Sequence, residues 1–119
     1  MKIVLLLLVL ALTNLYAQEN NFLPLCSMSK AKKLLQKIPA EEKRDKVKHC
    51  HMSCMLTLRC PAIDVYTFGL MKEFYDLFGP GDADQRDIKA NRIGISFVTR
   101  DNVKSDDQCY EACATFNWQ

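Results

Sequence analysis

Residues 49–60 read HCHMSCMLTLRC and gather three cysteines and two histidines in one short stretch. These side chains ligate zinc, carry thiol redox chemistry or form disulfides. Cys50 and Cys54 have C-x3-C spacing, which falls within the range used by zinc sites. A second C-x3-C pair, Cys109 and Cys113, lies near the C-terminus. The choice among these three kinds of chemistry depends on the rest of the sequence.

The N-terminal segment has the pattern of a secretory signal peptide. Lys2 supplies a positive charge, residues 3–12 are an unbroken apolar run, and Ala17 precedes the polar sequence QENN. We predict cleavage after Ala17, so that residues 1–17 are the signal peptide and 18–119 form a single helical disulfide-rich domain. The apolar run is shorter than the ~20 residues that a membrane span needs, so we expect no transmembrane segment.

Secretion favours disulfides over free thiols, and all six cysteines lie in the predicted mature part. Residues four apart on a helix share a face, so each C-x3-C pair is better placed to bond a facing helix than to close on itself. The favoured pairing joins Cys50–Cys113, Cys54–Cys109 and Cys26–Cys60, although other connectivities stay open. Redox sites usually use C-x2-C. We therefore predict neither a metal centre nor a redox thiol, and no cofactor.

The elements that position these residues are all expected to be helices. The sequence predicts an all-α fold, a small disulfide-stapled bundle of four to five helices. The expected helices cover 29–37, 39–59, 63–78, 85–100 and a short segment that carries CYEAC. Pro39 suits a first helical position, and Asp84 and Ser105 suit N-caps. Gly94, inside a helix, marks a close helix–helix approach or a break.

Apolar side chains recur at three- and four-residue spacing in the third expected helix. They are Ile63, Tyr66, Leu70, Phe74 and Leu77. This spacing is typical of an amphipathic helix. At the C-terminus, Phe116 and Trp118 are expected to dock as a tail.

Polar residues near the cysteines form a further pattern. It reads His49-Cys50-x2-Ser53-Cys54, Lys72-Glu73-x2-Asp76, Asp87-x2-Ala90-Asn91-x2-Gly94 and Cys109-x3-Cys113. This pattern, over residues 47–113, resembles the serum amyloid A-like helical domains, especially their cysteine-containing bacterial relatives. It is also similar to helical domains at the ends of large bacterial toxin-delivery proteins. The resemblance implies a compact helical bundle in a secreted protein. Six cysteines and the lack of a long glycine-rich stretch distinguish this chain from serum amyloid A, so lipid or retinol carriage is not implied.

Packing of the second, third and fourth helices would bring His49, Glu73, Asp76, Asp87 and Asn91 into one cluster. In a catalytic interpretation, His49 is a general base held by Glu73 or Asp87. In a structural interpretation, the cluster is a buried polar network that specifies one packing. We assign no catalytic residue and keep His49, Glu73, Asp87 and Asn91 as the alternative set. A cluster open to a cleft would favour an enzyme, and a sealed one would favour binding.

Two neighbouring residues bear on the choice between these interpretations. Ser53 could serve as a nucleophile by its type alone, but nothing in the sequence activates it. His51 points to a different face of the helix from His49, and we expect it to be exposed.

The acidic stretch GPGDADQRD partly matches the pattern of a calcium-binding loop. Asp82 and Asp84 match two positions of an EF-hand loop, but its glycine is missing and Arg86 stands at the fifth position. We expect helix capping there, with no calcium site.

Charge is distributed unevenly along the chain. Residues 30–48 carry eight Lys or Arg against three acidic residues, whereas 49–119 carry seven against ten. A basic segment is either a solvated helix face or a site for an anionic partner. The chain has no phosphate-binding glycine loop, and we expect no nucleic-acid binding.

Together these patterns predict a secreted protein, extracellular or periplasmic, that is a disulfide-stabilised helical binding protein. It would act on a protein partner or an amphipathic or anionic ligand, through the basic segment 30–48 or an apolar groove. The alternative is a small secreted hydrolase-like effector that uses the His/carboxylate cluster. The sequence predicts neither the ligand nor the oligomeric state.

Overall fold

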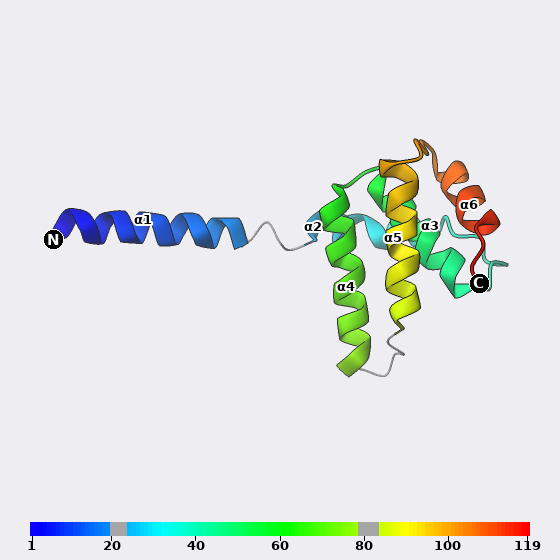
Figure 1. Cartoon of the computed structure of the whole chain (residues 1–119), viewed down its shortest axis with the longest axis horizontal. Coiled ribbons are helices and arrows are strands. Elements are labelled where there is room, and N and C mark those ends of the chain that lie inside the picture. Colours follow the sequence, from blue (N-terminus) through cyan, green and yellow to red (C-terminus); the bar gives the residue numbers. More distant parts are fainter. Residues whose placement is uncertain (20–23, 79–83) are drawn as a thin grey trace.

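The computed structural model is all-helical. It describes residues 1–19, 24–78 and 84–119, except the side chains of 13–19 and 76–78, and these residues contain no strand. The six helices found there are α1 (Lys2–Glu19), α2 (Leu25–Leu35), α3 (Asp45–Thr57), α4 (Ala62–Phe78), α5 (Gln85–Thr99) and α6 (Asp106–Thr115). The all-α prediction is confirmed, but the expected count of four to five helices is too low. The additional helix is α1, which covers the expected signal peptide and extends away from the others (Figure 1).

The core of the bundle is built around α3. This helix packs against α2, α4, α5 and α6. Val47, Cys50, Cys54 and Met55 are completely buried. Since neighbours surround α3 on several sides, most of its faces are buried, including polar positions.

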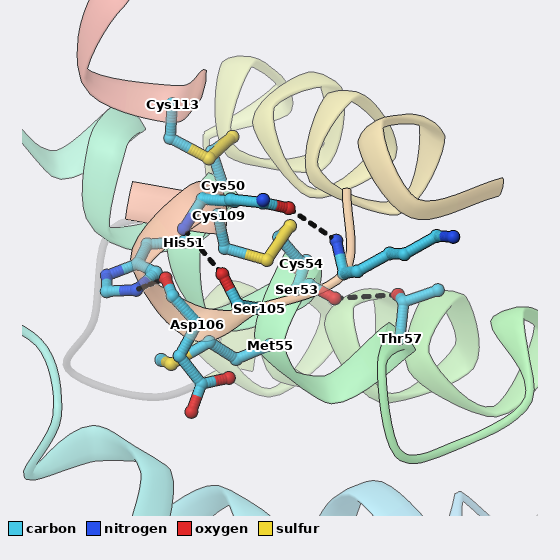
Figure 2. Close-up of a disulfide and its surroundings, with 12 residues drawn as sticks. Cys50, His51, Ser53, Cys54, Met55, Thr57, Ser105, Asp106, Cys109 and Cys113 are labelled. Carbon is cyan, nitrogen blue, oxygen red and sulfur yellow. Dashed lines mark hydrogen bonds between the residues drawn. A yellow bond between two sulfur atoms is a disulfide. The ribbon is translucent and has the colours of Figure 1, made fainter. Parts of the chain in front are cut away.

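Three disulfides hold the bundle, with the predicted pairing. Cys50–Cys113 and Cys54–Cys109 join α3 to α6, with Cα–Cα distances of 5.8 and 5.6 Å. Figure 2 shows these two bonds side by side. Cys26–Cys60 joins α2 to the segment after α3. The described residues include no free cysteine.

Glycines let α5 approach its neighbours closely. A Cβ atom at Gly94 would overlap the carbonyl oxygen of Cys50 and lie 3.1 Å from the amide nitrogen of Cys54. A Cβ atom at Gly69 of α4 would lie 2.5 Å from Nδ2 of Asn91. The prediction of a close helix–helix approach at Gly94 is therefore confirmed.

Side chains cap two helices as expected. The Asp84 carboxylate accepts a hydrogen bond from the amide of Arg86 at 2.8 Å at the start of α5. The Ser105 hydroxyl accepts one from the amide of Gln108 at 3.1 Å at the start of α6. Asp82, the other half of the calcium pattern, lies outside the described residues.

The helix predicted over 39–59 is shorter than expected, since α3 begins only at Asp45. The preceding chain forms a turn, in which the amide of Glu42 donates to the carbonyl of Pro39 at 3.0 Å. The Glu42 carboxylate then accepts from the amide of Arg44 at 3.0 Å and holds that residue in an extended conformation. Pro39 therefore does not open the helix.

The helix predicted to begin at residue 29 begins earlier, since α2 starts at Leu25. Ser27 lies inside α2, and its hydroxyl and amide both donate to Asp64 of α4, at 2.5 and 2.8 Å. The hydroxyl therefore ties two helices together.

The apolar stripe predicted in the third helix does not face the core. Ile63 and Phe74 are each 65% exposed. The buried positions of α4 are Val65, Gly69 and Glu73. The physical reason is Gly69, which has no side chain and therefore lets Asn91 of α5 come close. As a result, α4 packs against α5 with its less apolar face. The side chain of Leu77 lies outside the described residues.

Candidate functional site

An apolar groove of about 590 Å³ lies between α2, α3 and α4. Its apolar lining consists of Ala31, Leu35, Ile38, Pro39, Ala40, Met52 and Phe68. These residues come from three helices and from the turn before α3. The turn that replaces the first part of the predicted helix therefore supplies part of the groove.

Lysines border this groove. Lys32, Lys48 and Lys72 are among its lining residues, together with the acidic Glu42 and Asp45. Within the described residues, Lys32 and Lys48 take part in no ion pair. The groove thus combines a mainly apolar lining with cationic and acidic side chains.

The His/carboxylate cluster adjoins the groove. Three helices supply one residue each: His49 from α3, Glu73 from α4 and Asp87 from α5. One ligand atom of each lies within 4.8 Å of the other two. Nε2 of His49 lies 3.3 Å from Oδ2 of Asp87, and His49 also lines the groove. The prediction that these three residues converge is confirmed.

Burial sets the protonation of His49. Its partial burial lowers the pKa of the imidazole, an effect that the nearby Asp87 carboxylate opposes. The neutral imidazole is therefore favoured near pH 7, with a lone pair available for a proton or a metal ion.

Sequence reasoning missed the role of Lys46 at this cluster. Its Nζ lies 2.6 Å from Oδ1 of Asp87 and 3.1 Å from Oδ2 of Asp84. Burial opposes the charged form of Lys46, but its hydrogen bonds to the two carboxylates outweigh that effect and raise its pKa. Lys46 precedes His49 by three residues on α3, and this helical spacing was the available signal.

Asn91 belongs to a separate contact. The Ser53 hydroxyl donates to Oδ1 of Asn91 at 3.0 Å, and both side chains are buried. In the described part of the chain, Ser53 has no hydrogen bond to His49, so no base activates its hydroxyl. The side chain of Asp76, another expected member of the cluster, lies outside the described residues.

His51 is buried, contrary to prediction. Only 3% of it is exposed, because α6 covers that face of α3. Its Nε2 lies 3.3 Å from the carbonyl oxygen of Asp106, and its ring packs on Tyr110 at 5.3 Å (Figure 2 shows His51 and Asp106). Burial lowers the pKa of His51. This histidine therefore serves the packing of α6.

Part of the basic segment is paired inside the molecule. Arg44 binds the buried Glu42 carboxylate through Nη2 at 2.8 Å, and the Tyr110 hydroxyl donates to the same carboxylate at 3.0 Å. The hydrogen bonds from Arg44 lower the pKa of Glu42 to about 2. Lys37 pairs with Asp106 at 2.7 Å. The predicted anionic-ligand surface is therefore narrower than the whole segment 30–48.

The C-terminal aromatic residues pack on the bundle. Nε1 of Trp118 donates to the carbonyl of Cys113 at 2.8 Å. The ring of Phe116 lies between those of Trp118 and Phe97, with centroid distances of 4.7 and 6.2 Å. The tail docks on its own domain, as expected.

Comparison with known proteins identifies no family. The chain matches no protein-family model, and neither curated proteins nor solved structures give a significant match. The resemblance to serum amyloid A-like domains stays a prediction. Among the described helices, none combines the length and apolar character that crossing a membrane requires.

Proposed function

We propose that this chain is a secreted, disulfide-stabilised binding protein that holds an amphipathic ligand, a single acyl chain with an acidic headgroup, in the groove. The observation that carries the proposal is the apolar groove bordered by Lys32 and Lys48, two cations without an ion-pair partner in the described residues. The three disulfides are compatible with an extracellular location.

The size and lining of the groove suit such a ligand. Its volume of about 590 Å³ lies within the ~300–1,000 Å³ typical of small-molecule sites. Burying an acyl chain against side chains such as Met52 and Phe68 removes apolar surface from water, at about 0.8 kcal/mol for each methylene group. Lys32 and Lys48 would attract the carboxylate or phosphate headgroup and keep it at the edge.

A direct test is titration with a fluorescent fatty acid, such as parinaric acid. Leu35→Glu puts a negative charge into the groove at a residue that is already exposed, so the fold should survive. We expect the affinity to fall at least tenfold. Leu25→Glu is the matched control, since Leu25 is equally exposed on α2 and does not line the groove. Equal affinities in the two variants would contradict the proposal.

The headgroup preference has its own test. Lys48→Glu should weaken binding of a fatty acid but leave binding of the corresponding fatty alcohol nearly unchanged, because the alcohol carries no charge. Lys33→Glu is the control, as it is exposed on α2 and does not line the groove. Loss of both ligands with Lys48→Glu would argue against a role for this lysine in headgroup recognition.

A second candidate function is the hydrolase-like effector. It is favoured by one observation, that His49 lines the groove while it contacts the Asp87 carboxylate. His49 would then act as a general base on water. Turnover of simple carboxylic esters, with loss of turnover in His49→Gln, would support this alternative; no turnover in the wild-type protein would exclude it for that substrate class.

A further inference from the structure

We infer that His49, Glu73 and Asp87 form a binding site for a divalent transition-metal ion, with Zn²⁺ as the representative ion. This inference goes beyond the proposed function, since it depends on the cluster and not on the groove. The three residues come from three different helices and offer one nitrogen and two carboxylates.

The separation of the donor atoms fits one coordination sphere. Zinc binds histidine nitrogen at about 2.0–2.1 Å and carboxylate oxygen at about 2.0–2.2 Å, so neighbouring tetrahedral ligands lie about 3.3–3.5 Å apart. Nε2 of His49 and Oδ2 of Asp87 are 3.3 Å apart. The complete set, Glu73 included, lies within 4.8 Å. A small side-chain adjustment at Glu73 would complete a three-ligand site.

Glu73 supplies an independent reason to expect a ligand. It is only 5% exposed, and its Oε1 has no hydrogen-bond partner among the described residues. Its other oxygen accepts a hydrogen bond from the amide of Asp84 at 3.0 Å. A buried carboxylate oxygen without a partner is costly. A metal ion bound to that oxygen would remove the cost.

The donor set favours a transition metal over calcium or magnesium. Imidazole nitrogen suits zinc and its first-row neighbours, whereas calcium takes six to eight oxygen ligands. All six cysteines are in disulfides, so thiolate plays no part. Three protein ligands would leave a position for water.

Lys46 competes with a bound cation. Its ammonium lies 2.6 Å from Oδ1 of Asp87, on the same carboxylate whose Oδ2 faces His49. A metal ion would share Asp87 with this positive charge. The structure therefore predicts that removing the charge strengthens metal binding, an effect that a purely structural cluster would not produce.

Calorimetric titration of the full disulfide-bonded protein with Zn²⁺, without any amphiphile, tests the site. We expect one ion per chain and at least a tenfold loss of affinity in Glu73→Gln, which keeps an acceptor for the Asp84 amide. His51→Gln should bind Zn²⁺ like the wild type, because the His51 side chain faces α6 and is not part of the cluster. Lys46→Met should bind more tightly. Bound Co²⁺ should show visible d–d absorption without thiolate charge transfer.

Two outcomes would overturn the inference. One is the absence of 1:1 binding by the wild-type protein at millimolar Zn²⁺. The other is equal affinity in the wild type and in a folded Glu73→Gln variant. Fatty-acid titration of the same samples tests the two proposals separately. Zn²⁺ binding can be absent while the groove still binds the fatty acid, and fatty-acid binding can be absent while the cluster still binds Zn²⁺.

Discussion

Single atoms decide how close the helices of this protein come to one another. At Gly94, α5 crosses α3 with backbone against backbone, and a Cβ atom there would overlap the Cys50 carbonyl oxygen. The atoms in the way belong to a helix that two disulfides fix, so they cannot move aside easily.

We therefore expect Gly94→Ala to lower the free energy of unfolding by about 1–3 kcal/mol, the range typical of overpacked sites. Helix propensity alone would predict the opposite, because alanine favours helices over glycine by about 1 kcal/mol. Urea unfolding would measure the change. Arg92→Ala, on the exposed face of the same helix, is the control and should change stability by less than about 0.5 kcal/mol. A more stable Gly94→Ala variant would refute the close approach.

Glu42 is the second residue with a marked individual effect. Its pKa is lowered from 4.5 to about 2, chiefly by hydrogen bonds from Arg44. A carboxylate whose pKa is lowered by folding stabilises the folded state above its unfolded pKa, and this contribution is lost as the pH falls through the folded value.

The Glu42→Gln variant should therefore be less stable than the wild type above about pH 4.5, and the difference should shrink as the pH falls toward 2. Denaturant midpoints measured at intervals over that range would show the convergence. Glu41 is an exposed neighbour of Glu42. The denaturant midpoint of Glu41→Gln should therefore change with pH in the same way as that of the wild type. A constant gap between wild type and Glu42→Gln would mean that ionisation of Glu42 does not contribute.

At the scale of elements, the double link between α3 and α6 is more than two separate disulfides. Once Cys50–Cys113 is formed, Cys54–Cys109 closes only the short ring made of 50–54 and 109–113. Taken alone, each bond closes a long loop, with sequence separations of 63 and 55 residues. The entropy lost by the unfolded chain grows with loop length.

Removing either bond alone should therefore lower the free energy of unfolding by less than half of the decrease caused by removing both. The chain-entropy relation gives an excess of about 1.5 kcal/mol for the double removal over the sum of the single removals. A double-mutant cycle of Cys→Ser pairs, followed by denaturant unfolding, measures this excess. If the losses in the free energy of unfolding from the two single removals add up to the loss from the double removal, the two bonds do not share one loop. The Cys26–Cys60 bond closes a third loop, which overlaps the other two only within residues 50–60.

At the scale of the whole molecule, α1 differs from the rest. It projects from the bundle (Figure 1), and its residues 3–10 are exposed apolar side chains. Such a surface is unfavourable in water and is rare on soluble proteins. Removal of this segment after Ala17 stays a prediction.

We expect the secreted protein to begin at Gln18 and to contain three disulfides. Intact-mass measurement should match residues 18–119, and reduction should add the mass of six hydrogens. Peptide mapping would check the pairing. A mass that includes α1 would show that the segment is retained, and free thiols would overturn the stapled bundle.

Local patterns in the sequence determined the helical fold, the caps and the disulfide pairing. C-x3-C spacing puts two cysteines on one helix face, so the pairing of α3 with α6 follows from the repeat of that spacing at both ends of the chain. Asp84 and Ser105 cap because their side chains reach amides only two or three residues ahead. The convergence of His49 with Glu73 and Asp87 was also predicted, once the packing of three helices was assumed.

Only the tertiary structure decided which faces are covered. His51 is buried because α6 lies over it, and the apolar face of α4 is exposed because Gly69 and Glu73 pack inward instead. The groove and the pairing of Glu42 with Tyr110 join segments that are far apart in the chain. Helical periodicity places side chains on faces of each helix, but contacts between distant segments determine which face meets another helix and which meets water.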